Sequence, residues 1–334
     1  MELFDLLQRL TGAFGPSGCE KQVREEIAQL TAPYVDELTT DTMGNLIAHK
    51  KGEGKKLMFA AHMDSIGLVV THVEENGFLR FGAIGGLTTN DILRQSVVFE
   101  HGVRGVIGLS EEKEDAKDLN ITDLFVDIGA KNREEALTMV QLGDMAVYDA
   151  PCYQQNGKIY SKYLDNRSGC AVLIAALEQI KDATNDLYFV FTTQEEVGLR
   201  GAKTAAFGID PDVGIAVDVT GSDDVPGATH FCSSVLGKGP GVKVMDRSVI
   251  CQPHMVAWMN RVAQQAGVAV QQDVLRGGGT DAGTMMTNRF GVYSGGICIP
   301  CRYCHAPVAV CDLSDIEACA RFTAALAESE FVEE

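Results

Sequence analysis

The chain has 334 residues with 46 acidic and 28 basic side chains, which gives a formal net charge of −18. Its hydrophobic share of 46% is typical of a globular protein and excludes a disordered or fibrous chain. The acidic balance argues against nucleic acid or an anionic membrane as a partner, because contacts to phosphate need clustered Lys and Arg.

The start of the sequence leads us to expect a cytoplasmic protein. Glu2 and Asp5 stand where a signal peptide needs positive charge, and no apolar run approaches the roughly 18 residues of a membrane span. In a compartment that keeps thiols reduced, the ten cysteines are expected to be free, buried or metal-binding rather than paired.

Residues 1–66 predict the first part of an α/β domain. Two helices are indicated by apolar side chains at helical spacing: Leu3, Phe4, Leu7 and Leu10 in the first, and Val23, Ile27 and Leu30 in the second. Strands are predicted at 45–48 and 57–61. Residues 67–160 change in character, with short β-prone segments at 67–73, 96–100, 103–109 and 146–148 and one helix at 133–140. This spacing predicts a small β-rich insert of about 90 residues.

From residue 161 onward, helices and strands alternate. Helices are predicted at 167–180, 200–206, 255–265, 282–287 and 315–329, and strands at 187–193, 213–218, 269–274 and 292–299. Such alternation predicts a sheet with helices on both faces. The expected fold class is therefore α/β: residues 1–66 and 161–334 form one domain with a mixed sheet, interrupted by the insert at 67–160.

Histidines and carboxylates follow the ends of several predicted strands, and an aspartate opens the helix after the insert. These residues are His62, Asp64, Asp165, Glu195, Glu196, Asp218 and His305. Strand ends in an open α/β sheet share one edge, where unpaired negative charges repel unless cations lie among them. Two divalent metal ions would supply that charge, and His and carboxylate ligands without thiolate suit Zn²⁺, Co²⁺ or Mn²⁺.

Two pairs within this set indicate specific roles. Residues i and i+2 of a strand point the same way, so Asp64 is expected to accept a hydrogen bond from the ring N–H of His62. Glu195 and Glu196 are neighbours that point opposite ways in an extended segment. One is therefore expected to bind metal, and the other to accept a proton from metal-bound water.

Six motifs, in order along the chain, resemble the tetrahedral, or glutamyl/deblocking, aminopeptidases of metallopeptidase family 42. They are His62-Met-Asp64-Ser-Ile-Gly67, Leu164-Asp-Asn-Arg-Ser-Gly169, Thr193-Gln-Glu-Glu-Val-Gly-Leu-Arg-Gly-Ala202, Val217-Asp-Val-Thr220, Gly277-Gly-Gly-Thr-Asp-Ala-Gly283 and Arg302-Tyr-Cys-His-Ala-Pro307. The resemblance begins at Pro16-Ser-Gly18 and extends to the last helix. It therefore covers nearly the whole chain.

The resemblance implies a zinc-aminopeptidase-like fold and two divalent metal ions per subunit, zinc or cobalt, with manganese also suitable. By motif match, Asp165 would bridge the ions. His62 and Asp218 would complete one metal site, and Glu196 and His305 would complete the other.

The resemblance further implies an aminopeptidase that removes N-terminal residues from short peptides. Glu195 would be the general base for a metal-bridging water that attacks the scissile carbonyl, and Asp64 would hold His62. The insert corresponds to the family's dimerisation domain, and family members assemble from dimers into a dodecamer. Alternatives are a catalytically silent assembly protein on the same fold and a glycan hydrolase. The latter needs carboxyl groups roughly 5 to 9.5 Å apart, which adjacent side chains fit poorly.

Substrate contacts are less determined by the sequence. Arg247 and Arg302 would suit an acidic P1 side chain, although Arg247 fits a surface charge equally well, and Thr280 and Asp281 are further candidates. Acidic, aliphatic and basic P1 preferences all stay open, as do the native metal and the oligomeric state.

One cysteine run imitates a cofactor motif. Cys301-Arg-Tyr-Cys304-His305 matches the haem-attachment pattern C-x-x-C-H, and Cys298 adds a third cysteine at the same spacing. An iron–sulfur run would need a fourth cysteine at the position of Val308. We expect these cysteines to be small buried side chains of a strand.

Overall fold

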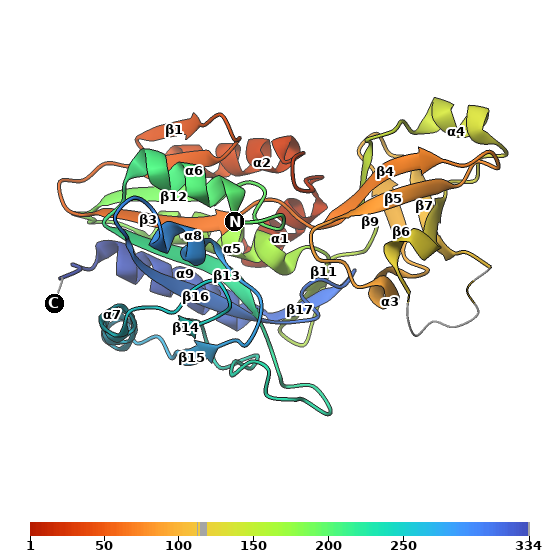
Figure 1. Ribbon diagram of the computed structural model, residues 1–334. Helices are drawn as coiled ribbons and strands as arrows, with labels where there is room; N and C mark the ends of the chain where they lie inside the picture. The colour runs from red at the N-terminus through yellow and green to blue at the C-terminus, as the bar shows by residue number, and fades with distance from the viewer. Residues whose placement is uncertain (112, 114–118, 333–334) are drawn as a thin grey trace.

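A mixed sheet of eleven strands runs through the larger part of the molecule (Figure 1). In spatial order its main path is β1 (Glu37–Thr40), β2 (Leu46–Lys50), β12 (Asp186–Thr192), β3 (Lys56–His62), β13 (Val213–Gly221), β16 (Tyr293–Arg302), β17 (Ala309–Asp312), β11 (Lys158–Ser161) and β10 (Tyr153–Gln155). β14 (Gly241–Met245) pairs with β16, and β15 (Gln271–Val274) pairs with β14. The structure describes residues 1–111, 113 and 119–332 in a computed structural model.

The four central strands β12, β3, β13 and β16 are parallel to one another. Thr192 at the end of β12 lies opposite His62 at the end of β3, and Ala216 of β13 lies opposite Ala60. The carboxyl ends of these strands therefore meet at one edge of the sheet, as expected for strand ends in an open α/β sheet.

Helices cover both faces of the sheet, which confirms the predicted α/β class. One face packs against α1 (Leu3–Gly12), α2 (Lys21–Thr31), α5 (Leu164–Gln179), α7 (Pro253–Gln265) and α9 (Leu313–Glu328), and the other against α6 (Arg200–Ile209) and α8 (Asp281–Met286). Along β3, Phe59 belongs to the first core while Met58 and Ala60 belong to the second, because successive side chains of a strand point to opposite faces. Within the described residues, no helix combines the length and the apolarity that a membrane crossing requires.

The β-rich insert contains a closed barrel that projects from one end of the α/β unit (Figure 1). Its strands, in spatial order, are β4 (Gly67–Val73), β5 (Leu79–Ile84), β8 (Leu124–Asp127), β7 (Arg104–Leu109), β6 (Ser96–Phe99) and β9 (Met145–Tyr148). Two short helices accompany them, α3 (Thr89–Ile92) and α4 (Arg133–Met139). The barrel has a hydrophobic core of its own, with Val70, Val97 and Ile107 among its buried side chains.

Several strands of the structure were not predicted from the sequence. β10 and β11 lie within the segment assigned to the insert, yet β11 pairs with β17 of the large sheet, so the barrel strands end at Tyr148. β14 escaped prediction because it carries Lys243, whose charge argues against a buried strand. In the structure, Lys243 is fully buried and its Nζ lies 2.6 Å from Asp273 Oδ2 and 3.4 Å from Asp246 Oδ2.

Candidate metal centre

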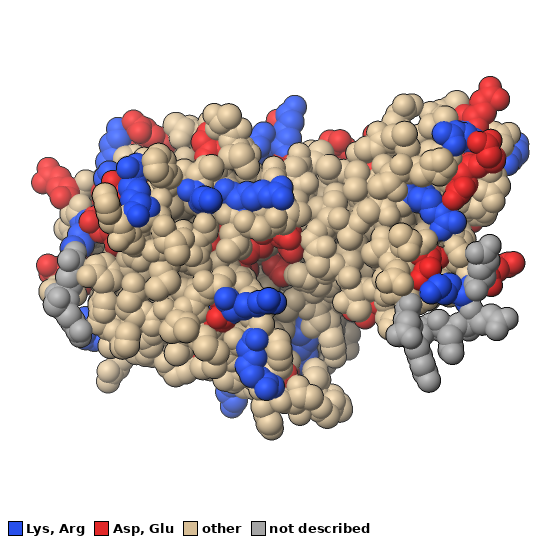
Figure 2. Space-filling model, in the orientation of Figure 1, with Lys and Arg blue, Asp and Glu red and all other residues tan. Residues whose placement is uncertain are grey.

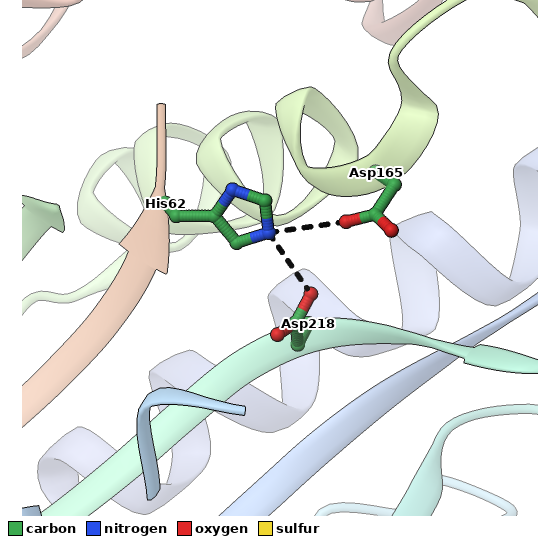
Figure 3. Close-up of side chains that lie close together, drawn as sticks. All are labelled: His62, Asp165 and Asp218. Atoms are coloured by element: carbon green, nitrogen blue, oxygen red, sulfur yellow. Dashed lines mark hydrogen bonds and ion pairs between the residues drawn. The ribbon is translucent and has the colours of Figure 1, made fainter. Parts of the chain in front are cut away.

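Asp165 lies between two histidines at the carboxyl edge of the sheet. Its Oδ1 is 3.0 Å from Nε2 of His62, which stands at the end of β3, and its Oδ2 is 3.2 Å from Nε2 of His305. Asp218 of β13 approaches the same His62 nitrogen at 3.6 Å, so that His62 faces both carboxylates (Figure 3). Glu196 Oε2 is 3.4 Å from the His305 nitrogen. Two groups of possible metal ligands, called donor groups below, therefore share the Asp165 carboxylate: His62–Asp165–Asp218 and Asp165–Glu196–His305.

The backbone around Asp165 departs from helical geometry and places its side chain in the centre. Tyr163 adopts a left-handed conformation, and Asp165 and Asn166 have non-helical dihedral angles before the regular part of α5 begins. The Asn166 amide donates a hydrogen bond of 2.8 Å to the carbonyl of Val217 in β13. This bond fixes the start of α5 against the strand that carries Asp218.

Asp64 has a different partner from the one expected. The His62 ring nitrogen Nδ1 lies 3.1 Å from the backbone carbonyl oxygen of Asp64 but 3.7 Å from its carboxylate, so the carbonyl is the closer acceptor. The buried Asp64 carboxylate instead accepts hydrogen bonds from the amides of Glu195 and Glu196, at 3.0 and 3.2 Å, and from the hydroxyl of Ser17, at 2.6 Å. The Asp64 side chain thus positions the turn that carries the two glutamates.

The two glutamates on that turn face different histidines. The turn follows β12, where Gln194 has a φ of 54°. Glu195 Oε2 is 3.9 Å from His62 Nε2, whereas Glu196 approaches His305. Glu195 belongs to neither donor group but borders the same cavity, which leaves its carboxylate available for proton transfer.

The electrostatics of the centre reflect buried negative charge. Burial and the neighbouring Asp165 charge raise the pKa of Glu196 to about 8, and burial raises the pKa of Glu195 well above its usual value. Burial opposes a charged imidazole, but hydrogen bonding to Asp165 and the Glu196 charge outweigh it and raise the pKa of His305 to about 10. The centre therefore attracts positive charge strongly.

The donor atoms fit divalent cations. Within each group, His62–Asp165–Asp218 and Asp165–Glu196–His305, the possible ligand atoms lie within 4.8 Å of one another. The second oxygen of Glu196, Oε1, is buried and has no hydrogen-bond partner among the described residues. Imidazole nitrogens and carboxylate oxygens are ligands of Zn²⁺, Co²⁺ and Mn²⁺, and neither group includes a cysteine.

A cavity of about 430 Å³ opens above this centre. Figure 2 shows acidic side chains at the floor of a hollow near the middle of the face shown. The remaining lining residues are uncharged: Gly86, Gly198, Leu199, Val219, Thr220, Gly221, Leu275, Gly278, Gly279, Thr280 and Cys304. The cavity has the size and shape of a small-ligand site.

The four candidate substrate residues are placed differently. Thr280 lines the cavity, and its hydroxyl is buried with no hydrogen-bond partner among the described residues. Asp281 is buried and does not line the cavity, and it accepts a 2.6 Å hydrogen bond from the Thr192 hydroxyl. Arg302 forms a two-bond ion pair with Asp224, at 2.6 and 2.7 Å, and neither Arg302 nor the exposed Arg247 lines the cavity. The structure therefore gives no support to Arg302 as a substrate contact.

The cysteine run lies in and after β16. Cys298 and Cys301 are buried in the strand, and Cys304 is half-buried beside the cavity. All ten cysteines are free thiols. These positions agree with the packing interpretation.

Two residues that touch the centre had no assigned role in the sequence. Ser17 donates a hydrogen bond to Asp64, and the sequence indicated it only as part of Pro16-Ser-Gly18, where the family resemblance begins. Gly86 of the barrel accepts a hydrogen bond from His305, and its contact joins residues 219 positions apart. No local pattern indicates such a distant pairing.

Comparisons with known proteins agree with this geometry. Residues 44–322 match the family model described as M42 glutamyl aminopeptidase. A protein of Acetivibrio thermocellus, named provisionally as an aminopeptidase, is 48% identical over 94% of this chain and 95% of its own. An aminopeptidase structure from the archaeon Desulfurococcus kamchatkensis has a TM-score of 0.94 and 40% identity, covering 98% of this chain and 94% of its own.

A second similar structure is the TET1 peptidase of Pyrococcus horikoshii. Its TM-score is 0.89 at 32% identity, and the match covers 98% of this chain and 99% of that one. That protein is described as a dodecamer, and as able to assemble into a tetrahedron or a large octahedral shell.

We expect Zn²⁺ or Co²⁺ to raise the melting temperature of the metal-free protein. An ion that binds only the folded state stabilises it by about 2.7 kcal/mol at one hundred times its dissociation constant. Asp165→Asn should lose most of this stabilisation because Asp165 belongs to both donor groups, whereas Asp5→Asn on the exposed face of α1 should retain it. Scanning fluorimetry after chelator treatment measures the effect. Equal stabilisation of both variants would contradict the assignment of Asp165.

Proposed function

Because the chain belongs to the M42 glutamyl aminopeptidase family, we propose that it removes N-terminal residues from short peptides with two divalent metal ions. The family identifies it as a metal-dependent peptide hydrolase. One observation carries the two-metal proposal, namely the Asp165 carboxylate that directs one oxygen to His62 and the other to His305.

Five side chains would hold the ions. Asp165 would bridge them, with His62 and Asp218 completing one site and Glu196 and His305 the other. The donor set favours zinc or cobalt, and manganese is also suitable. When bound, the ions would polarise the scissile carbonyl and stabilise negative charge on its oxygen.

Glu195 would act as the general base. Its carboxylate borders the cavity and belongs to neither donor group. Its backbone amide donates a hydrogen bond to Asp64, which holds the residue in place. It would accept a proton from the attacking water and return it to the leaving amine. Burial raises the pKa of Glu195, and a carboxylate with a raised pKa is a stronger proton acceptor.

The remaining walls of the cavity would receive the first side chain of the peptide. The acidic floor suits the free N-terminal ammonium, and the buried Thr280 hydroxyl is available for a polar contact. Among the described residues that line the cavity, none is Lys or Arg, and all its carboxylates belong to the centre. We therefore favour a neutral P1 side chain over an acidic one.

The barrel would be a self-association domain. Support comes from the resemblance of the insert to the family's dimerisation domain and from the dodecamer described for the TET1 peptidase of Pyrococcus horikoshii. We propose that copies of this chain pair through the barrel and that the dimers assemble into a dodecamer.

Replacing Glu195 with Gln should lower kcat about 100- to 10,000-fold, the usual contribution of a positioned general base. Metal content should stay at two ions per chain, because Glu195 is in neither donor group. Glu317→Gln, on the exposed face of α9, is the matched control and should leave kcat unchanged. A Glu195→Gln variant with near-normal kcat would refute the assignment of the base.

A panel of aminoacyl chromogenic substrates tests the P1 proposal. Leucyl and methionyl derivatives should have kcat/KM values at least tenfold above the glutamyl derivative, since no Lys or Arg among the described lining residues would pair with a P1 carboxylate as it loses its hydration. A glutamyl preference would overturn the proposal. A cellulose-type polymer in the same panel should remain uncleaved, and its hydrolysis would favour the glycan hydrolase instead.

Light scattering tests the assembly. A particle of about twelve times the chain mass of 35.9 kDa is expected at micromolar concentration. Backbone amides of the barrel should exchange faster when dilution releases smaller species, because association would bury them. A monomer at all concentrations, or protection confined to the α/β unit, contradicts the proposal.

A further inference from the structure

The turn after β5 brings the barrel into the metal centre. This turn is formed by Gly85 and Gly86, and Gly86 lines the cavity. The carbonyl oxygen of Gly86 lies 2.8 Å from Nδ1 of His305. The opposite ring nitrogen, Nε2, faces Asp165 and Glu196. A carbonyl only accepts hydrogen bonds, so in the neutral imidazole that binds a metal ion this contact places the ring proton on Nδ1 and leaves Nε2 as the ligand atom.

Both positions require glycine for a close approach of the backbone. Gly85 has a φ of +74°, and a Cβ there would lie 2.7 Å from Ile66 Cγ2 and 3.2 Å from Glu196. A Cβ on Gly86 would lie 3.2 Å from His305 Nδ1, closer than an ordinary contact. Gly86 does not have a positive φ, so an alanine there would test the space against His305 without backbone strain.

The two histidines of the centre differ in how they are held. The His62 side chain is 2% exposed at the end of a central strand, whereas the His305 side chain is 39% exposed in the segment after β16. His62 also has an acceptor within its own segment, the carbonyl of Asp64. The corresponding acceptor for His305 comes from the barrel. Packing therefore fixes His62, while the orientation of His305 depends on Gly86.

We infer that the barrel completes one of the two metal sites. The Gly85–Gly86 turn acts as a positioning element for the group Asp165–Glu196–His305, while the group with His62 and Asp218 forms without it. This inference rests on the proposed two-metal function, and it assigns the insert a part in the catalytic centre in addition to self-association. Loss of an oriented hydrogen-bond partner behind a ligand typically weakens metal binding 10- to 100-fold.

The test compares Gly86→Ala with Gly82→Ala, a matched variant in β5, the strand that precedes the turn. A Cβ on Gly82 would make only ordinary contacts of 3.5 Å with Thr71 and Val69. Co²⁺ binding to the metal-free proteins is measured by calorimetry and by elemental analysis. In Gly86→Ala, one of the two dissociation constants should rise 10- to 100-fold and the other should stay unchanged, and Gly82→Ala should match the wild type.

A double variant identifies the ion that is lost. Gly86→Ala combined with His305→Ala should bind Co²⁺ no more weakly than His305→Ala alone, because both changes act on the same ligand. Combined with His62→Ala, the loss should instead affect both ions. Additive weakening in the His305→Ala background would overturn the inference.

A backbone change removes the acceptor without adding volume. Replacing Leu87 with its α-hydroxy acid converts the Gly86–Leu87 amide to an ester, whose carbonyl is a weaker acceptor. The same single dissociation constant should rise, by a smaller factor. If the wild type binds fewer than two ions, the proposed function fails. If it binds two ions and the ester and Gly86→Ala proteins bind both with unchanged affinity, only the barrel inference fails.

Discussion

The parallel pairing of β12, β3, β13 and β16 is the constraint on which the rest of the structure depends. It brings the ends of β3 and β12 and the carboxylate of Asp218 to one edge, where Asp165 enters from the start of α5. Carboxylates gathered at a buried edge repel one another and lose hydration, so the arrangement is unfavourable without compensating positive charge. Burial and the neighbouring carboxylates accordingly raise the pKa values of Glu195 and Glu196. A pair of divalent cations would supply the compensating charge.

The sequence was sufficient for features that follow from strand periodicity. Apolar strands ending in His62 and Asp218 predict a shared edge whatever the loops do, and the structure brings Asp165, Glu196 and His305 to that edge. It was insufficient where a partner comes from a distant loop. The Asp64 side chain was expected to contact the His62 ring, but its carboxylate instead accepts hydrogen bonds from the Glu195 amide and the Ser17 hydroxyl. β14 was missed for a related reason, since the buried charge of Lys243 is compensated by residues that no local pattern identifies.

The uncharged walls of the cavity are themselves supported by buried charge. Lys243 pairs with Asp273, which accepts a hydrogen bond from the wall residue Thr220 at 2.8 Å. Lys243 also pairs with Asp246, which accepts from Ser248, whose hydroxyl in turn accepts from the Thr280 amide at 3.1 Å. A single buried ammonium group thus joins two sides of the cavity. Breaking either pair would leave an uncompensated buried charge. Both walls of the cavity therefore resist displacement.

The barrel can orient His305 only if it is itself fixed to the α/β unit. Hydrogen bonds fix its connection to β3. Ser65, between β3 and β4, donates from its amide and hydroxyl to the Gly15 carbonyl, and its own carbonyl accepts from the Ser17 amide. Gly15 is held in turn by the fully buried Arg167 of α5, whose Nη2 donates to the same carbonyl at 3.1 Å.

At the other end of the barrel, Lys162 donates to the carbonyl of Tyr148 at 2.7 Å. Because Arg167 and Lys162 flank Asp165 in sequence, the segment that carries Asp165 also anchors both ends of the barrel. The Gly86 carbonyl and Asp165 are therefore held in one frame, which is the condition for a turn of the insert to orient His305.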